Sequence, residues 1–237
     1  MSRREFDPAQ SEWMDRAQPV SRELAADLQN LAAINRRFGG RRIWRHFLKR
    51  WIRPGGRYRL LDLATGGGDG PRFMIDFARR VGASVEITAI DAQPATLALA
   101  RNCSVDYPEI TFREADILAL DVASERGAYD FAFCSLALHH FREPDAVSIL
   151  RHLRELPRRG AVAADLSRGF TCSAGAWWIT ALLYREAMTK HDARMSARRA
   201  FSFDELARLA PEAGWSDFGH RRFAFGRQAI WWEADAV

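Results

Sequence analysis

The chain has 237 residues, of which 48% are hydrophobic and 27% are charged. This balance is that of a globular domain, and it excludes wholesale disorder, collagen-like repeats and low-complexity fibres. The longest apolar run, Ala174 to Tyr184, is too short to span a bilayer. We expect no secretory signal, because the first residues lack an apolar stretch. The three scattered cysteines form neither a disulfide framework nor a metal-binding motif, so we expect a reducing, cytoplasmic location.

The first 56 residues have helical patterns that end at the breaker Pro54-Gly55-Gly56. Between Arg36 and Arg53 lie eight basic residues and no acid. Apolar residues recur there at helical spacing, at Ile43, Trp44, Phe47, Leu48, Trp51 and Ile52. The pattern predicts an amphipathic helix that packs on the sheet with a solvated basic face. Two other roles stay open, contact with an anionic membrane and RNA binding, although no RNA-binding signature accompanies the helix.

Residues 57–166 alternate between strand-like and helix-like patterns. The expected strands span 58–63, 85–90, 110–113, 129–134 and 160–166. The expected helices span 71–80 and 143–156, and a third begins at Pro94. Strands that alternate with helices predict a parallel sheet covered on both faces. Ligands of such sheets bind at the carboxyl ends of the strands.

A glycine-rich turn, Asp62-Leu63-Ala64-Thr65-Gly66-Gly67-Gly68-Asp69-Gly70, follows the first expected strand. Consecutive glycines let the backbone approach a ligand closely and present N–H groups ahead of a helix. The turn lacks the third glycine of a dinucleotide fingerprint, which weakens the case for NAD or FAD. No Gly-Lys-Ser/Thr follows it, so a P-loop is excluded.

Acidic residues follow the next two strands. Asp91 ends the second strand, where a carboxylate can accept hydrogen bonds from both hydroxyls of a ribose, although it can also cap the following helix. Asp116 follows the third strand and can accept a hydrogen bond from an exocyclic amine, or it can be a solvated loop acid.

This series of strand ends resembles that of the class I S-adenosylmethionine-dependent methyltransferases, over roughly residues 57–166. The turn 62–69 is similar to the acidic glycine-rich motif of the ubiquinone and menaquinone biosynthesis methyltransferases. Asp91 matches the ribose-binding acid, Ala115-Asp116-Ile117 the adenine-side motif, and the stretch Cys134 to His140 the segment after the fourth strand. One departure is Ala64, which stands where many members have a glycine.

The resemblance implies S-adenosylmethionine as cofactor and a Rossmann-like α/β sheet, mostly parallel with an antiparallel C-terminal strand. Asp62 and the backbone of residues 64–68 would hold the methionine part, and Ser135 would lie near the sulfonium. The cofactor-binding residues implied are Asp62, Ala64, Thr65, Gly66, Gly68, Asp91, Ala92, Asp116, Ile117 and Ser135.

A sulfonium methyl group is already activated, so alignment and a dry pocket supply most of the catalysis. A hydroxyl acceptor benefits from a base, and His140, next to His139 beyond the fourth strand, is the predicted catalytic residue as base or hydrogen-bond partner. The segment from Ser135 to Leu138 lacks the Pro-Pro-Tyr-type motif of enzymes that methylate nucleic-acid amines or protein glutamine. No cluster with metal-ligand spacing is evident, so we expect no metal.

We expect residues 1–56 to form a helical lid over the substrate pocket, and residues 57–237 to form the methyltransferase domain. An apolar insertion at about 167–200 is expected either to pack as core or to line a pocket for an aromatic or lipophilic acceptor. The runs 218–225 and 228–233 are expected to form an antiparallel hairpin.

The predicted function is methylation of a small aromatic or lipophilic molecule, with oxygen preferred as the acceptor atom. Carbon methylation of a quinone-type precursor and methylation of RNA or another macromolecule through the basic helix are the alternatives. A protein that binds the cofactor without catalysis is a third. We expect no nucleic-acid partner, and membrane contact stays open.

Overall fold

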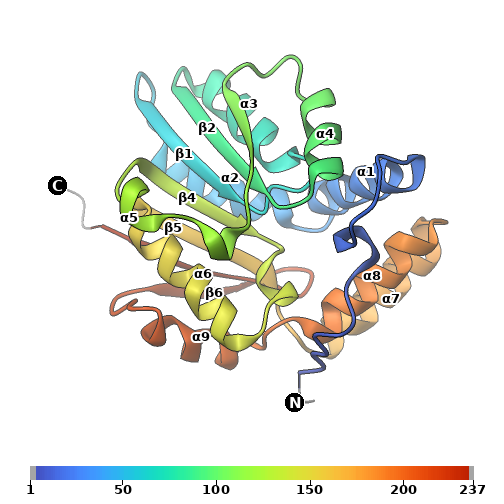
Figure 1. The fold of residues 1–237 in the computed structure, drawn as a ribbon. Helices are drawn as coiled ribbons and strands as arrows, with labels where there is room; N and C mark the ends of the chain where they lie inside the picture. The colour runs from blue at the N-terminus through green and yellow to red at the C-terminus, as the bar shows by residue number, and fades with distance from the viewer. Residues whose placement is uncertain (1–3, 235–237) are drawn as a thin grey trace.

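A computed structural model describes residues 4–234 of the chain (Figure 1). The short 3₁₀ helices are η1 (Trp13–Asp15), η2 (Ile117–Ala119) and η3 (Leu138–His140). The α-helices are α1 (Arg22–Arg37), α2 (Gly40–Trp51), α3 (Asp69–Val81), α4 (Pro94–Asn102), α5 (Val122–Glu125), α6 (Glu143–Glu155), α7 (Phe170–Leu183), α8 (Ala187–Arg199) and α9 (Phe203–Glu212). The strands are β1 (Arg57–Leu63), β2 (Ser84–Asp91), β3 (Ile110–Glu114), β4 (Tyr129–Ser135), β5 (Pro157–Leu166), β6 (Gly219–Phe223) and β7 (Arg227–Glu233).

The seven strands form one sheet in the order β3-β2-β1-β4-β5-β7-β6. Strands β1 to β5 run parallel, and β7 runs antiparallel to both β5 and β6. The central strands are apolar almost throughout because helices cover both faces of the sheet. The predicted mostly parallel Rossmann-like sheet with an antiparallel C-terminal strand is therefore confirmed. The strand order reverses between β1 and β4, and this switch point is where such sheets bind ligands.

Two layers of helices sandwich the sheet. Helices α2 and α3 pack on one face, while α6 and α9 pack together on the other. Helix α2 buries the apolar stripe seen in the sequence, and the ring of Trp51 stacks on that of Phe131 with centroids 4.5 Å apart. Within the predicted lid, α2 thus belongs to the hydrophobic core, and its basic residues Arg42, Arg45, Lys49 and Arg50 are exposed.

A separate group of segments lies over the carboxyl ends of the strands. It comprises the N-terminal segment with η1, helix α1, and the pair α7 and α8, which lie side by side (Figure 1). The buried Asp192 of α8 accepts hydrogen bonds from the backbone N–H groups of Trp13 and Met14, at 2.8 and 3.0 Å. The hydroxyl of Thr189 donates to Asp27 of α1 at 2.6 Å. Helix α8 therefore anchors both η1 and α1 above the sheet.

Several expected boundaries differ from those observed. Helix α3 begins at Asp69, two residues earlier than expected, because Gly68 is its N-cap. Pro157, expected only to end a helix, opens β5 opposite Tyr129, and the pairing shifts register before Phe131. The insertion folds as two helices, α7 and α8. In the C-terminal hairpin β6 is shorter than the expected run, and β7 begins one residue earlier than expected. None of the helices within residues 4–234 has the length and apolarity that crossing a membrane requires.

Candidate functional site

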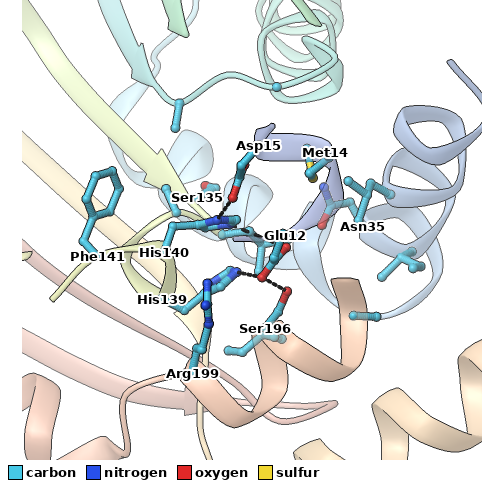
Figure 2. Close-up of a pocket in the computed structure, with 18 of the residues that line it drawn as sticks. Glu12, Met14, Asp15, Asn35, Ser135, His139, His140, Phe141, Ser196 and Arg199 are labelled. Atoms are coloured by element: carbon cyan, nitrogen blue, oxygen red, sulfur yellow. Dashed lines mark hydrogen bonds and ion pairs between the residues drawn. The ribbon is translucent and has the colours of Figure 1, made fainter. Parts of the chain in front are cut away.

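A cavity of about 690 Å³ opens at the carboxyl ends of the strands, within the usual size range of small-molecule sites. Figure 2 shows part of its lining. Every cofactor-binding residue implied by the resemblance except Gly68 lines this cavity, and so does His140. Gly68 instead caps α3 and packs beside Phe112. The sheet topology thus gathers at one place residues that lie far apart in the sequence.

The turn after β1 has the left-handed backbone that its glycines predict. Gly66 has φ +54° and Gly68 has φ +72°. Ala64, where the related enzymes have glycine, also lies in this region with φ +55°. An alanine fits sterically, as expected, but its Cβ makes this conformation costly by roughly 1–2 kcal/mol. Ala64 lines the cavity, and strained backbone conformations are often found at ligand-binding sites.

Asp91 lies at the tip of β2 and joins two loops. One oxygen accepts from the N–H of Gly66 at 2.8 Å, and the other accepts from the N–H of Gln93 at 3.0 Å. Helix α4 has Gln93 as its N-cap, so Asp91 does not cap this helix. Because a carboxylate has about four acceptor sites, each oxygen keeps a lone pair for a ribose hydroxyl. Asp116 is exposed at the cavity edge and is the N-cap of η2, where its side chain accepts from the N–H of Leu118.

Asp62 is buried at the floor of the cavity, and burial raises the pKa of its carboxyl to about 7. A carboxyl in this state gains from a neighbouring cation, such as the ammonium of an amino-acid ligand. Near it, the indole N–H of Trp44 donates to the hydroxyl of Ser135 at 2.9 Å, which joins α2 to the end of β4. Leu136, the next residue, has φ +56° and also lines the cavity.

These residues fit S-adenosylmethionine. Asp62 provides an anion for its ammonium group, and Asp91 provides acceptors for its ribose. The glycine turn between them leaves the backbone accessible at Gly66, where a Cβ would meet nothing within 4 Å. Ile117 provides an apolar surface beside Asp116 for the adenine.

His140 lies in the cavity between two carboxylates (Figure 2). Its Nδ1 is 2.6 Å from Asp15 Oδ2, and its Nε2 is 3.9 Å from Glu12 Oε2. Burial disfavours a charged ring, yet Glu12 and Asp15 together raise the pKa of His140 to about 10. Burial also raises the pKa of Glu12, which is 2% exposed.

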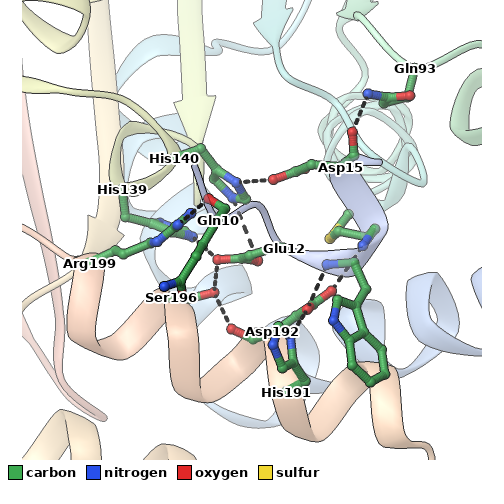
Figure 3. A network of polar contacts seen from close by, with 12 residues as sticks. Gln10, Glu12, Asp15, Gln93, His139, His140, His191, Asp192, Ser196 and Arg199 are labelled. Carbon is green, nitrogen blue, oxygen red and sulfur yellow. Dashed lines mark hydrogen bonds and ion pairs between the residues drawn. The ribbon is translucent and has the colours of Figure 1, made fainter. Parts of the chain in front are cut away.

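His139 also lies between two carboxylates, those of Asp165 and Glu12, and Figure 3 shows it beside Glu12. Its Nδ1 is 2.7 Å from Asp165 Oδ1, and its Nε2 is 3.7 Å from Glu12 Oε1. The hydroxyl of Ser196 donates to the same oxygen of Glu12 at 2.7 Å. Two aspartate–histidine pairs therefore converge on one buried glutamate. We call Glu12, Asp15, His139, His140 and Asp165 the histidine–carboxylate cluster.

Sequence reasoning missed most of this cluster. Asp15 and His140 are 125 positions apart, and no spacing rule relates them. Asp165 was detectable, because it lies at the carboxyl end of the fifth expected strand. Side-chain donor atoms of Glu12, His139 and His140 all lie within 4.8 Å of one another, although these residues have no metal-ligand spacing in the sequence.

The remaining wall of the cavity is apolar. It includes Phe6, Met14, Leu31, Ile34, Phe38, Phe141, Ile179 and Phe225. Helix α7, the predicted apolar insertion, contributes Gly175, Ala176 and Ile179 to this wall. The opposite side of α7 exposes Trp177, Trp178, Leu182 and Leu183. The insertion therefore lines the pocket with one face and leaves an apolar face in solvent.

Comparison with known proteins agrees with this geometry. Residues 60–160 match the family model described as a methyltransferase domain. The chain is 34% identical over 88 residues to the 2-phytyl-1,4-naphtoquinone methyltransferase of Thermosynechococcus vestitus. That match spans 37% of this chain and 38% of the relative.

Solved structures share the fold. A SAM-dependent methyltransferase from Aquifex aeolicus superposes with a TM-score of 0.60 at 15% identity, over 87% of this chain and 96% of that one. Human N-acetylserotonin methyltransferase, solved in complex with SAM, superposes with a TM-score of 0.63 at 15% identity, over 88% and 55% of the two chains. The family model, the fold and the strand-end residues agree: residues 60–160 match a methyltransferase domain, the solved structures share its fold, and the residues at the strand ends fit S-adenosylmethionine as the cofactor.

Proposed function

We propose that this chain methylates an oxygen atom of a small lipophilic aromatic molecule, with S-adenosylmethionine as methyl donor. The observation that carries the proposal is the position of the histidine–carboxylate cluster. Glu12, His139 and His140 line the same cavity as the cofactor residues Asp62 and Asp91. The apolar wall formed by the N-terminal segment, α1 and α7 lines that cavity too.

Different residues of the chain bind the cofactor, bind the acceptor and remove the acceptor's proton. When bound, the cofactor supplies a methyl group activated by a positively charged sulfur. Asp62 and Asp91 fix the cofactor, and the apolar wall binds the acceptor and excludes water. The acceptor oxygen attacks the methyl carbon as the carbon–sulfur bond breaks, and the electron pair of that bond stays on sulfur. The hydroxyl proton passes to a carboxylate of the histidine–carboxylate cluster. His140, the residue predicted from the sequence as base or hydrogen-bond partner, acts as the hydrogen-bond partner of the acceptor oxygen, because its pKa of about 10 keeps the ring protonated at neutral pH.

The cluster favours oxygen over carbon as the acceptor atom. Apolar walls alone suffice to bury an aromatic ring, whereas the imidazoles and carboxylates of the cluster offer hydrogen-bonding groups that only a polar part of the acceptor can use. A hydroxyl group at the edge of the ring is such a polar part. Methylation of carbon is the second candidate, because the curated relative is named as a naphthoquinone methyltransferase. A carbon acceptor activated by an adjacent hydroxyl would use the same cluster.

To test the proposal, purified protein is incubated with S-adenosylmethionine and with each member of a panel of phenols and hydroquinones that carry alkyl chains of increasing length. Mass spectrometry and NMR then identify the methylated product and the atom that carries the new group. We expect an O-methylated product, a KM that falls with chain length, and a turnover lowered at least about tenfold in His140→Gln, while affinity for S-adenosylhomocysteine is kept. A C-methylated product alone would replace the proposal by its second candidate, and no product from any member would refute both.

A further inference from the structure

We propose that Glu12, His139 and His140 form a binding site for one divalent transition-metal ion, and that the acceptor oxygen completes the coordination of this ion. The metal site itself stands on the geometry of the three residues. The role of the acceptor oxygen rests on the proposed function. The inference departs from the expectation of no metal, which was based on sequence spacing.

The tautomers of the two histidines support the site. Nδ1 of His139 and Nδ1 of His140 lie 2.7 and 2.6 Å from carboxylates of Asp165 and Asp15. An ionised carboxylate only accepts hydrogen bonds, so both Nδ1 atoms carry the proton. Nε2 is therefore the atom of each ring that is left to bind an ion, and an ion that binds there displaces any proton that Nε2 carries. This carboxylate–histidine arrangement is the one that orients histidine ligands in metal sites.

Both Nε2 atoms lie near the carboxylate of Glu12. They are 3.7 and 3.9 Å from the two carboxylate oxygens of Glu12. These distances exceed those of an N–H···O hydrogen bond, so a proton alone bridges the gap poorly. An ion bound at roughly 2.1 Å from each ligand atom separates two ligands by about 3.4 Å at a tetrahedral angle. Small shifts of the three side chains would therefore bring all of them within bonding distance of one ion.

The surroundings hold the third ligand in place. The hydroxyl of Ser196 donates to Glu12 Oε1 at 2.7 Å, which fixes the carboxylate. Asp192 fixes the following residues, Trp13 and Met14, through their backbone N–H groups. All three ligand residues line the cavity, so an ion can reach them from the side on which the acceptor would bind (Figure 2). Two imidazoles and one carboxylate suit zinc, manganese or iron(II) better than calcium or magnesium.

The site also specifies how the acceptor binds. With Glu12, His139 and His140 engaged as ligands, the ion would take over the activation of the acceptor: a hydroxyl that coordinates it would release its proton to solvent and remain as an oxyanion, which is a better nucleophile for the methyl group. Because Glu12 and His140 share the cavity with Ser135, the predicted neighbour of the sulfonium, the oxyanion is held beside the methyl donor. The ligand class is therefore a phenol or another acidic hydroxyl compound.

Metal binding is tested on untagged protein that has been treated with a chelator and dialysed. Zinc and manganese are titrated calorimetrically, and cobalt(II) is titrated by its visible absorption. We expect one ion per chain, with at least about hundredfold weaker binding in Glu12→Gln and His140→Gln. Asp165→Asn is expected to bind about ten- to hundredfold more weakly, because it loses the hydrogen bond that orients His139. His152→Gln, which alters a histidine outside the cavity, is expected to bind as the wild type does.

Binding of S-adenosylhomocysteine, measured by thermal shift, shows that each variant is folded. Should Glu12→Gln fail to fold, His140→Gln and Asp165→Asn decide the question. Absence of saturable binding in the wild type, or equal binding in wild type and folded variants, would overturn the metal site and leave a metal-free cluster. Ion binding without transfer of a methyl group would instead refute the proposed function and leave the metal site standing. Loss of turnover on chelation, with recovery on return of the ion, would support the coordinated acceptor.

Discussion

The backbone N–H of Gly66 donates to the carboxylate of Asp91 at 2.8 Å, so this contact joins the glycine-rich turn to the tip of β2. The turn that would face the methionine part of the cofactor and the carboxylate that would face its ribose are therefore held in a fixed relation to each other. A contact between two binding segments lowers the cost of ordering the site on binding.

The first prediction follows from this contact. Asp91→Ala removes the ribose acceptor and releases the turn, and hydrogen bonds to charged groups contribute roughly 1.5–3 kcal/mol each. We expect calorimetry to show affinity for S-adenosylhomocysteine lowered by about ten- to hundredfold or more. Asp106→Ala, at an exposed position away from the cavity, is the control. Unchanged affinity in Asp91→Ala would remove Asp91 from the cofactor site.

The second prediction concerns Ala64, whose φ of +55° is unfavourable for a residue with a Cβ. Ala64→Gly relieves this strain but makes the unfolded chain more flexible, and the difference is expected to stabilise the protein by about 0.5–1 kcal/mol. For a domain of this size the melting temperature should rise by about 1–4 °C. Ala92→Gly, at a position with negative φ beside the same cavity, should lower it. A melting temperature lowered equally by both substitutions would mean that Ala64 is not strained.

The cofactor half of the site could be predicted from the sequence for a physical reason. Parallel strands present their carboxyl ends at one edge, so residues that follow the expected strands must meet there. Asp91 and Asp116 were found in this way, the roles of Asp62 and Ser135 were implied by the family resemblance, and all four residues line the cavity. The left-handed conformation of Leu136 had no such signal, since leucine rarely adopts it.

The acceptor half could be predicted only in part. Glu12 and Asp15 lie in and beside a three-residue 3₁₀ helix without hydrophobic periodicity, and their position depends on Asp192 in a distant insertion. No local pattern contains this information. Peripheral membrane contact stays a prediction, but its exposed apolar residues, such as Trp178 and Leu182, lie on α7 rather than on the basic helix α2.

The third prediction is the pH dependence of cofactor binding. Burial raises the pKa of Asp62 to about 7 from an ordinary value of 3.8, so a substantial fraction of this carboxyl is protonated at neutral pH in the free protein. Pairing with the cofactor ammonium requires the ionised form. Affinity for S-adenosylhomocysteine should therefore rise by about tenfold per pH unit between pH 5 and pH 7, and level off above pH 7.

Asp62→Asn is the matched variant, since an amide of the same shape does not titrate. It should bind the cofactor more weakly at pH 8 and lose the contribution of Asp62 to the pH profile. The same raised pKa means that the buried charge reduces stability as pH rises from about 4 through about 7. Asp62→Asn should accordingly be more stable than the wild type at pH 8, by a margin that shrinks toward pH 5. An unchanged binding profile in this variant would assign the titration to another group.

The fourth prediction separates positioning of the acceptor from binding of the cofactor. Asp192 is buried and accepts hydrogen bonds from Trp13 and Met14, so it sets the position of the adjoining Glu12. Asp192→Ala should leave these N–H groups without a partner and let the segment shift. Because a displacement of about 1 Å at a reacting group can cost about hundredfold in rate, we expect turnover to fall by about ten- to hundredfold.

Affinity for S-adenosylhomocysteine should change by no more than about twofold in Asp192→Ala, because Asp62 and Asp91 are carried by β1 and β2. Steady-state kinetics with the best acceptor of the phenol panel, together with calorimetry, measures both quantities. Asp217→Ala, on the exposed surface, should alter neither. If cofactor affinity and turnover fell together in Asp192→Ala, helix α8 would support the whole cavity, and the N-terminal segment would have no separate role in placing the acceptor.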